Sequence, residues 1–174
     1  MEKIVVIGAG QAGSSLVAKL RNEGFDGRVT LLGAEPAPPY QRPPLSKAYL
    51  LGEMERERLF LRPAQFYTDQ EIDLRLGICV KRVDLAAKTL SVGTETLPFD
   101  QLAFTTGARA RTVPAAIGGD LEGVLTVRDL ADVDRMEPYV TRGGHVLIVG
   151  GGYIGLEAAA VARKKGLSGT LIEM

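Results

Sequence analysis

Short aliphatic runs followed by glycine-rich turns occur twice in the chain, near its start and near its end. Residues 4–7 and 146–149 are apolar without alternation, which is typical of strands buried on both faces of a parallel sheet. After the first turn, Leu16, Val17 and Leu20 recur at helical spacing, and a second apolar strand follows at 29–32. The second turn precedes the same order of helix and strand. The pattern therefore predicts two βαβ units.

The middle of the chain has a different pattern. Strand-like runs at 78–84, 88–92 and 101–106 are separated by tight links, which predicts an antiparallel meander attached to the main sheet. A polar helix is expected near 129–140. The fold class is therefore α/β: a Rossmann-like domain with an antiparallel β-meander, over residues 1–108, followed by the start of a second Rossmann-like domain over residues 109–174.

Both turns have the spacing Gly-x-Gly-x-x-Gly. The first glycine allows the tight turn, the second lets a pyrophosphate approach the backbone, and the third lets helix and strand pack closely. The helix N-terminus then offers N–H groups to phosphates. A glutamate that can accept hydrogen bonds from a ribose stands about 20 residues beyond the third glycine in each copy. The residues are Gly8, Gly10, Gly13 and Glu35 in the first copy, and Gly150, Gly152, Gly155 and Glu173 in the second.

Two nucleotide sites in one chain suggest a protein that passes electrons between two cofactors. A carboxylate at the ribose position repels a 2′-phosphate, so Glu173 favours NADH over NADPH. Glu35 is compatible with FAD or NAD, and spacing alone does not choose between them.

Composition excludes several other classes of protein. The formal net charge is zero, so nothing indicates binding to nucleic acid or to an anionic membrane surface. No apolar run approaches the ~20 residues of a membrane span, and no signal peptide is visible. Cys79 and His145 are single, so neither a redox cysteine pair nor a histidine metal cluster is expected. The single cysteine favours the cytoplasm. We expect Cys79 to be a small buried strand residue and His145 to be an exposed start of a strand.

Five prolines in residues 36–44 predict a stiff, extended loop. A helix is expected from Ser46, whose hydroxyl can cap it. The loop can be read as a rigid wall of a cofactor site or as a polyproline ligand for a partner domain.

The segment Pro-Tyr-Gln-Arg-Pro-Pro-Leu-Ser-Lys-Ala-Tyr-Leu at 39–50 strongly resembles a loop of FAD-dependent ferredoxin reductases, the putidaredoxin-reductase-like enzymes. Gly-Gly-Gly-Tyr-Ile-Gly-Leu-Glu at 150–157 resembles their NAD fingerprint. Thr-Thr-Gly-Ala-Arg at 105–109 resembles their flavin-contacting turn, usually Ala-Thr-Gly, from which Thr105 departs.

The resemblance implies FAD in the first site and NADH in the second. The residues it implies for FAD are Gly8, Gly10, Gly13, Glu35, Arg42, Lys47, Val80, Thr106, Gly107 and Arg109. Those for NADH are Gly150, Gly152, Tyr153, Ile154, Gly155, Glu157 and Glu173.

Lys47 and Glu157 are the catalytic candidates that the resemblance implies. A lysine ammonium near the flavin lowers the cost of the negative charge gained on reduction, and Glu157 would orient both the lysine and the nicotinamide amide. From the residues alone, an exposed lysine and a glutamate that favours a helix N-terminus explain the pair equally well.

The function implied is transfer of a hydride from NADH to FAD, and of single electrons to a [2Fe–2S] ferredoxin of a P450 or ring-hydroxylating oxygenase system. Family members are longer, so the return segment of the FAD domain and a C-terminal domain are expected beyond these residues. Alternatives are a truncated nucleotide-binding module without turnover, or a related flavoprotein: a nitrite reductase subunit, a rubredoxin reductase or an apoptosis-inducing-factor-like protein.

Overall fold

The computed structural model describes residues 1–173, which fall into two compact units. The first unit comprises Met1–Tyr40 and Phe60–Ala108, and the second comprises Gln41–Leu59 and Arg109–Met174. One break between the units falls after Ala108, and Gln41–Leu59 belongs to the second unit. The division into domains 1–108 and 109–174 stays a prediction. The assignment of one cofactor to each stretch of sequence stays a prediction.

A four-stranded parallel sheet forms the centre of the first unit. The strand order is β3-β2-β1-β7, which is the order of one half of a doubly wound parallel sheet. The strands are β1 (Lys3–Ile7), β2 (Arg28–Leu32), β3 (Ile72–Arg75) and β7 (Gln101–Phe104). The helices are α1 (Gln11–Asn22) and α2 (Ala64–Asp69).

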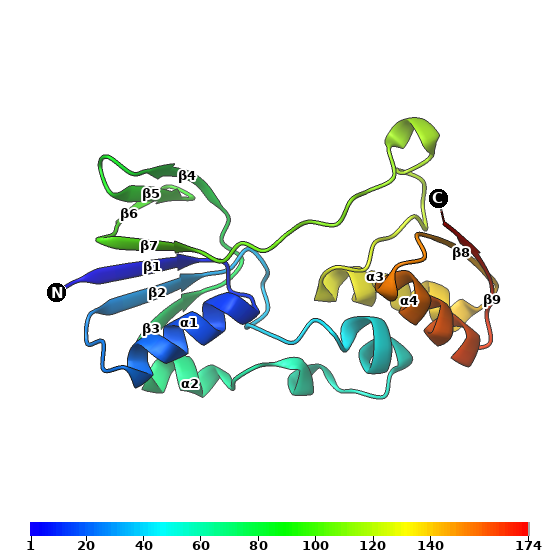
Figure 1. Ribbon diagram of the computed structural model, residues 1–174, viewed down its shortest axis with the longest axis horizontal. Helices are drawn as coiled ribbons and strands as arrows, with labels where there is room; N and C mark the ends of the chain where they lie inside the picture. The colour runs from blue at the N-terminus through cyan, green and yellow to red at the C-terminus, as the bar shows by residue number, and fades with distance from the viewer. Residues whose placement is uncertain (174) are drawn as a thin grey trace. The chain divides into compact units, whose positions relative to one another are not determined.

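Alternation along β1 divides the core of this unit into two layers (Figure 1). Val6 points toward α1 and α2, where it packs with Val17 and Tyr67. Val5 and Ile7 point to the opposite face, against buried residues of the antiparallel strands. Both faces of the sheet are thus covered, which explains why residues 4–7 are apolar without alternation.

The antiparallel meander is confirmed, but its third strand differs from the prediction. It consists of β4 (Val80–Asp84), β5 (Thr89–Val92) and β6 (Glu95–Pro98). Gly93, at φ +59°, allows the tight turn between β5 and β6. The run at 101–106, expected in the meander, instead forms β7, which pairs parallel with β1 in the main sheet.

Cys79 is exposed, so the prediction of a buried cysteine was wrong. Its neighbours Ile78 and Val80 both pack against the core beside the meander. Because successive side chains of extended backbone point to opposite sides, the cysteine between them faces outward.

The second unit contains the second βαβ motif: β8 (His145–Val149), α4 (Tyr153–Lys164) and β9 (Ser168–Ile172), with the strands parallel. His145 is exposed, as predicted. The polar helix is α3 (Leu130–Arg142). Short helical turns are η1 (Leu45–Tyr49), η2 (Arg56–Leu59) and η3 (Ala115–Ile117), and both α3 and α4 contact η1. Within residues 1–173, no helix combines the length and apolar character needed to cross a bilayer.

Candidate functional site

The first glycine turn joins β1 to α1, and close packing accounts for two of its three glycines. A Cβ on Gly13 would lie 2.1 Å from the carbonyl oxygen of Gly8. A Cβ on Gly8 would lie 2.2 Å from the carbonyl oxygen of Thr105. Strand, turn and helix therefore approach one another too closely for any side chain at these two positions.

Packing does not account for Gly10. A Cβ there would meet nothing within 4 Å among the described residues, and its φ is −95°, which any residue adopts. Gly10 stands at the N-terminus of α1, where backbone N–H groups are available to an anion. The open space in front of Gly10 fits the close approach of a pyrophosphate to the backbone.

The second turn, between β8 and α4, repeats part of this arrangement. A Cβ on Gly155 would lie 1.9 Å from the carbonyl oxygen of Gly150, whereas one on Gly152 would have no described atom within 4 Å. Tyr153 and Ile154, which open α4, are 89% and 52% exposed. This turn thus shares with the first the close packing at its third glycine and the open space at its second, whereas a Cβ on Gly150, unlike one on Gly8, would have no described atom within 4 Å.

The two predicted ribose acids are held in different ways. The half-buried carboxylate of Glu35, just after β2, accepts a hydrogen bond from the hydroxyl of Tyr40, a buried residue of the proline loop. The carboxylate of Glu173, just after β9, accepts a hydrogen bond from the backbone N–H of Gly151. Glu173 is therefore at its own glycine turn. The hydrogen bond from Tyr40 to this acid was not predicted, although the tyrosine lies only five residues after the glutamate in the sequence.

Thr105, noted in the sequence only as a departure from a motif, anchors the first turn. Its hydroxyl donates to the carbonyl oxygens of Gly8 at 2.8 Å and Ile7 at 3.2 Å. The next residues, Thr106 and Gly107, are exposed, and Val80 is half-buried at the start of β4. The turn after β7 is therefore fixed to the turn after β1.

Lys47 and Glu157 meet within the second unit. The Lys47 Nζ lies 3.0 Å from Oε1 of Glu157, and the hydroxyl of Ser46 donates to Oε2 at 2.6 Å. These hydrogen bonds, that from Ser46 first and that from Lys47 second, hold the pKa of the Glu157 carboxyl below its ordinary value. Ser46 was expected to cap a helix. Instead the residue before η1 is Pro44, and the serine hydroxyl is used on Glu157.

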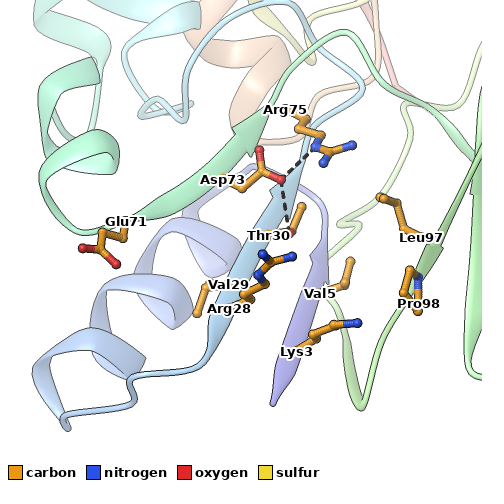
Figure 2. A pocket seen from close by; sticks show the side chains of 10 residues that line it. All are labelled: Lys3, Val5, Arg28, Val29, Thr30, Glu71, Asp73, Arg75, Leu97 and Pro98. Carbon is orange, nitrogen blue, oxygen red and sulfur yellow. Dashed lines mark hydrogen bonds and ion pairs between the residues drawn. The ribbon is translucent and has the colours of Figure 1, made fainter. Parts of the chain in front are cut away.

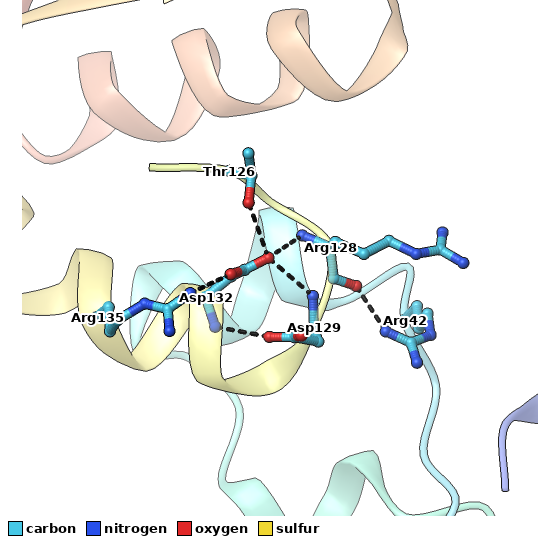
Figure 3. A network of polar contacts seen from close by, with 6 residues as sticks. All are labelled: Arg42, Thr126, Arg128, Asp129, Asp132 and Arg135. Carbon is cyan, nitrogen blue, oxygen red and sulfur yellow. Dashed lines mark hydrogen bonds and ion pairs between the residues drawn. The ribbon is translucent and has the colours of Figure 1, made fainter. Parts of the chain in front are cut away.

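Arg42 is fixed by a polar network at the start of α3 (Figure 3). Its Nη1 donates to the carbonyl oxygen of Arg128 at 2.7 Å. The buried carboxylate of Asp132 accepts hydrogen bonds from the backbone N–H groups of Arg128 and Asp129 and from the side chains of Thr126 and Arg135. Asp129 and Asp132 form a capping box, a pattern visible in the sequence that was not used. Arg109 is exposed.

A cavity of about 330 Å³ in the first unit is lined by residues of β1, β2, β3 and β6, and no residue of either glycine turn lines it (Figure 2). Asp73 accepts hydrogen bonds there from Thr30 and Arg75, and Arg75 also contacts Glu95. None of the predicted site residues lines this cavity.

Comparisons with known proteins identify the family of the chain. Residues 2–174 match the model of the family described as pyridine nucleotide-disulphide oxidoreductase. Rhodocoxin reductase of Rhodococcus erythropolis is 44% identical over 171 residues, covering 98% of this chain and 40% of that protein. The ferredoxin–NAD(+) reductase component of the biphenyl dioxygenase system of Paraburkholderia xenovorans is 41% identical over 174 residues, covering 99% of this chain and 42% of that protein.

Among solved structures, the covalent complex of putidaredoxin reductase with putidaredoxin matches with a TM-score of 0.91 and 34% identity, covering 98% of this chain and 42% of that one. The Rossmann-like fold and the similarity to ferredoxin reductases are thereby confirmed. The chain spans about two fifths of the length of these relatives. The chain belongs to the pyridine nucleotide-disulphide oxidoreductase family.

Proposed function

We propose that this chain provides the FAD site and the NADH site of a ferredoxin reductase. Such an enzyme transfers a hydride from NADH to FAD and then single electrons to a [2Fe–2S] ferredoxin of a P450 or ring-hydroxylating oxygenase system. The observation that carries the proposal is the duplicated glycine turn, each copy with an open second glycine, a close-packed third glycine and a carboxylate after the second strand.

The described residues have defined roles in this proposal. The turn for the FAD pyrophosphate is formed by Gly8, Gly10 and Gly13, and Glu35 accepts hydrogen bonds from the adenosine ribose of FAD. The other residues that line this cofactor are Val80, Thr106, Gly107, Arg42 and Arg109. Gly150, Gly152 and Gly155 form the turn for NADH, with Glu173 at its ribose and Tyr153 and Ile154 at the start of α4.

Bound FAD supplies the chemistry that converts a two-electron hydride donor into a source of single electrons. The contribution of the chain is electrostatic. The ammonium of Lys47 compensates the negative charge that develops at the cofactor, and Glu157 fixes that ammonium from Oε1. Neither residue gives up a proton in this role.

Two narrower assignments rest on single residues. Glu173 repels a 2′-phosphate, which supports NADH over NADPH. The lone, exposed Cys79 supports a reducing compartment, and we assign the protein to the cytoplasm on that ground.

The proposal is tested by purifying the chain with added FAD and recording the visible flavin band before and after anaerobic addition of NADH. Bound FAD that is bleached by NADH, and reoxidised by ferricyanide and then by a [2Fe–2S] ferredoxin, is the expected result. Bound FAD that NADH leaves oxidised would identify a nucleotide-binding module without turnover instead.

A lysine variant tests the chemical step with a matched control. Lys47→Ala should slow bleaching while FAD stays bound. Lys19→Ala removes another exposed lysine, which lies on α1 and pairs with Glu23, and it should leave the rate of bleaching unchanged. Equal rates for the two variants would remove Lys47 from the mechanism.

A further inference from the structure

Ser46 shares the carboxylate of Glu157 with Lys47, although the two positions are 111 residues apart in the sequence. Only 5% of Ser46 is exposed, against 52% of the Lys47 side chain. The two donors use different oxygens: the serine hydroxyl binds Oε2 and the lysine ammonium binds Oε1. The carboxylate is therefore held from both sides by consecutive residues.

Consecutive residues do not normally reach the same group from a helix, because their side chains point about 100° apart. Lys47 leaves the helical conformation, with φ −129° and ψ −112°, in the middle of η1. This break turns its side chain back toward the carboxylate that Ser46 already binds. The kink in η1 thus serves a local purpose, which is to place a hydroxyl and an ammonium on one acid.

The hydrogen bond from Ser46 and the ion pair with Lys47 differ in how firmly each can hold the Glu157 carboxylate in one position. An ion pair with an exposed lysine gains little in water, and its long side chain samples many rotamers. A buried serine has one rotatable side-chain bond to its oxygen, and its hydrogen bond to an ionised acceptor belongs to the stronger class. Ser46 is consequently the better anchor for the carboxylate, and Lys47 is oriented by an acid that is already held.

We propose that Ser46 is a positioning residue: by holding Oε2 of Glu157 it presents Oε1 to Lys47 and so sets where the ammonium stands at the flavin. The part of this inference that concerns the flavin rests on the proposed function. The hold on Glu157 itself concerns only residues of this chain.

The first test follows the Glu157 carboxyl directly, without any cofactor. NMR of isotope-labelled glutamate side chains, with Glu157→Gln identifying the resonance, gives its titration in the full chain. Ser46→Ala should raise the pKa of Glu157 toward its ordinary value, and Ser46→Thr, which keeps a hydroxyl, should restore the low value. Ser14→Ala removes another buried, hydrogen-bonded serine hydroxyl and should leave the Glu157 titration unchanged.

The second test uses the chain loaded with FAD. Ser46→Ala should slow bleaching by NADH roughly tenfold, less than the ~100-fold that a misplacement of 1 Å can cause. FAD affinity should stay the same, and Ser46→Thr should recover the rate. A purely structural role would lower thermal stability in both serine variants of η1 without this recovery.

The outcomes separate the two proposals. An unchanged Glu157 titration in Ser46→Ala overturns the hold on the carboxylate, whatever the flavin does. A shifted titration with an unchanged bleaching rate overturns the link to the flavin. A wild-type chain that binds no FAD overturns the proposed function, and the titration alone then decides whether Ser46 anchors Glu157.

Discussion

Substitutions at Gly13 and Gly10 of the first turn distinguish the effect of close packing on stability from the effect of ligand contact on binding. At Gly13 a Cβ would stand 2.1 Å from the Gly8 carbonyl oxygen, so the backbone must move in Gly13→Ala. Overpacking of this kind costs about 1–3 kcal/mol, offset in part by the ~1 kcal/mol better helix propensity of alanine. Because the clash is with backbone, which cannot rotate away, the upper part of that range applies, about 2–3 kcal/mol. We therefore expect a net loss of about 1–2 kcal/mol, which lowers the melting temperature by about 2–8 °C.

Gly10→Ala should behave in the opposite way. A Cβ there meets nothing within 4 Å, and φ is already −95°. The modest cost of alanine at an N-cap and the ~0.4–1 kcal/mol gained from a stiffer unfolded chain should nearly cancel. FAD affinity should nevertheless fall at least tenfold, about 1.4 kcal/mol, because the methyl group occupies the path of the pyrophosphate.

The assay pairs urea unfolding of the nucleotide-free chain with titration by FAD, followed by flavin fluorescence. A Gly10→Ala protein as unstable as Gly13→Ala would show that the space in front of Gly10 is not open in solution. A stable Gly10→Ala protein that binds FAD normally would refute the assignment of the pyrophosphate to this turn. Gly152→Ala and Gly155→Ala provide the same comparison for NADH.

Three further predictions concern single residues. Burial and the hydrogen bond to Asp134 raise the pKa of Tyr49 to about 12. In an alkaline titration, the absorbance of the Tyr49 tyrosinate should therefore appear at high pH, and at lower pH in Asp134→Asn. The associated stabilisation is present below pH 10 and is lost as pH rises toward 12. Asp132→Ala should reduce the free energy of unfolding in urea by about 2–4 kcal/mol, because it leaves the partly buried N–H groups of Arg128 and Asp129 without this acceptor. Exposed Glu137→Ala should change the same free energy by less than about 0.5 kcal/mol. Thr105→Ala should cost about 1 kcal/mol in the same assay through loss of the bonds to the first glycine turn, and an unchanged unfolding midpoint would exclude that anchoring role.

The elements that were predictable from sequence are those with a local signal. Both βαβ units combine an apolar strand, a glycine turn and a helical period, and both formed where expected. By contrast, β3 and α2 were missed because four and six residues are too short for a periodic pattern. The strand at 101–104 was recognised but paired wrongly, since nothing within it specifies that its neighbour is β1, about one hundred residues earlier.

The same distinction applies to the candidate site. The glycines and the two acids follow from spacing along the chain. The contacts that hold them do not, because the Thr105 hydroxyl meets Gly8 across 97 residues and the Ser46 hydroxyl meets Glu157 across 111. Threonine and serine are common in loops, so their presence alone does not indicate a partner. Only the folded arrangement shows which hydroxyls are used.

The membership of Gln41–Leu59 in the second unit has a consequence for the proposed chemistry. Ser46, Lys47 and Glu157 all lie in that one unit, although the linear sequence places the first two in the FAD-binding stretch. Their mutual distances of 2.6 and 3.0 Å are therefore set by the packing of α4 against η1 within the unit. The contacts of Lys47 and Ser46 with Glu157 therefore do not depend on the first unit, so the orientation of the ammonium by the carboxylate is built within the second unit alone.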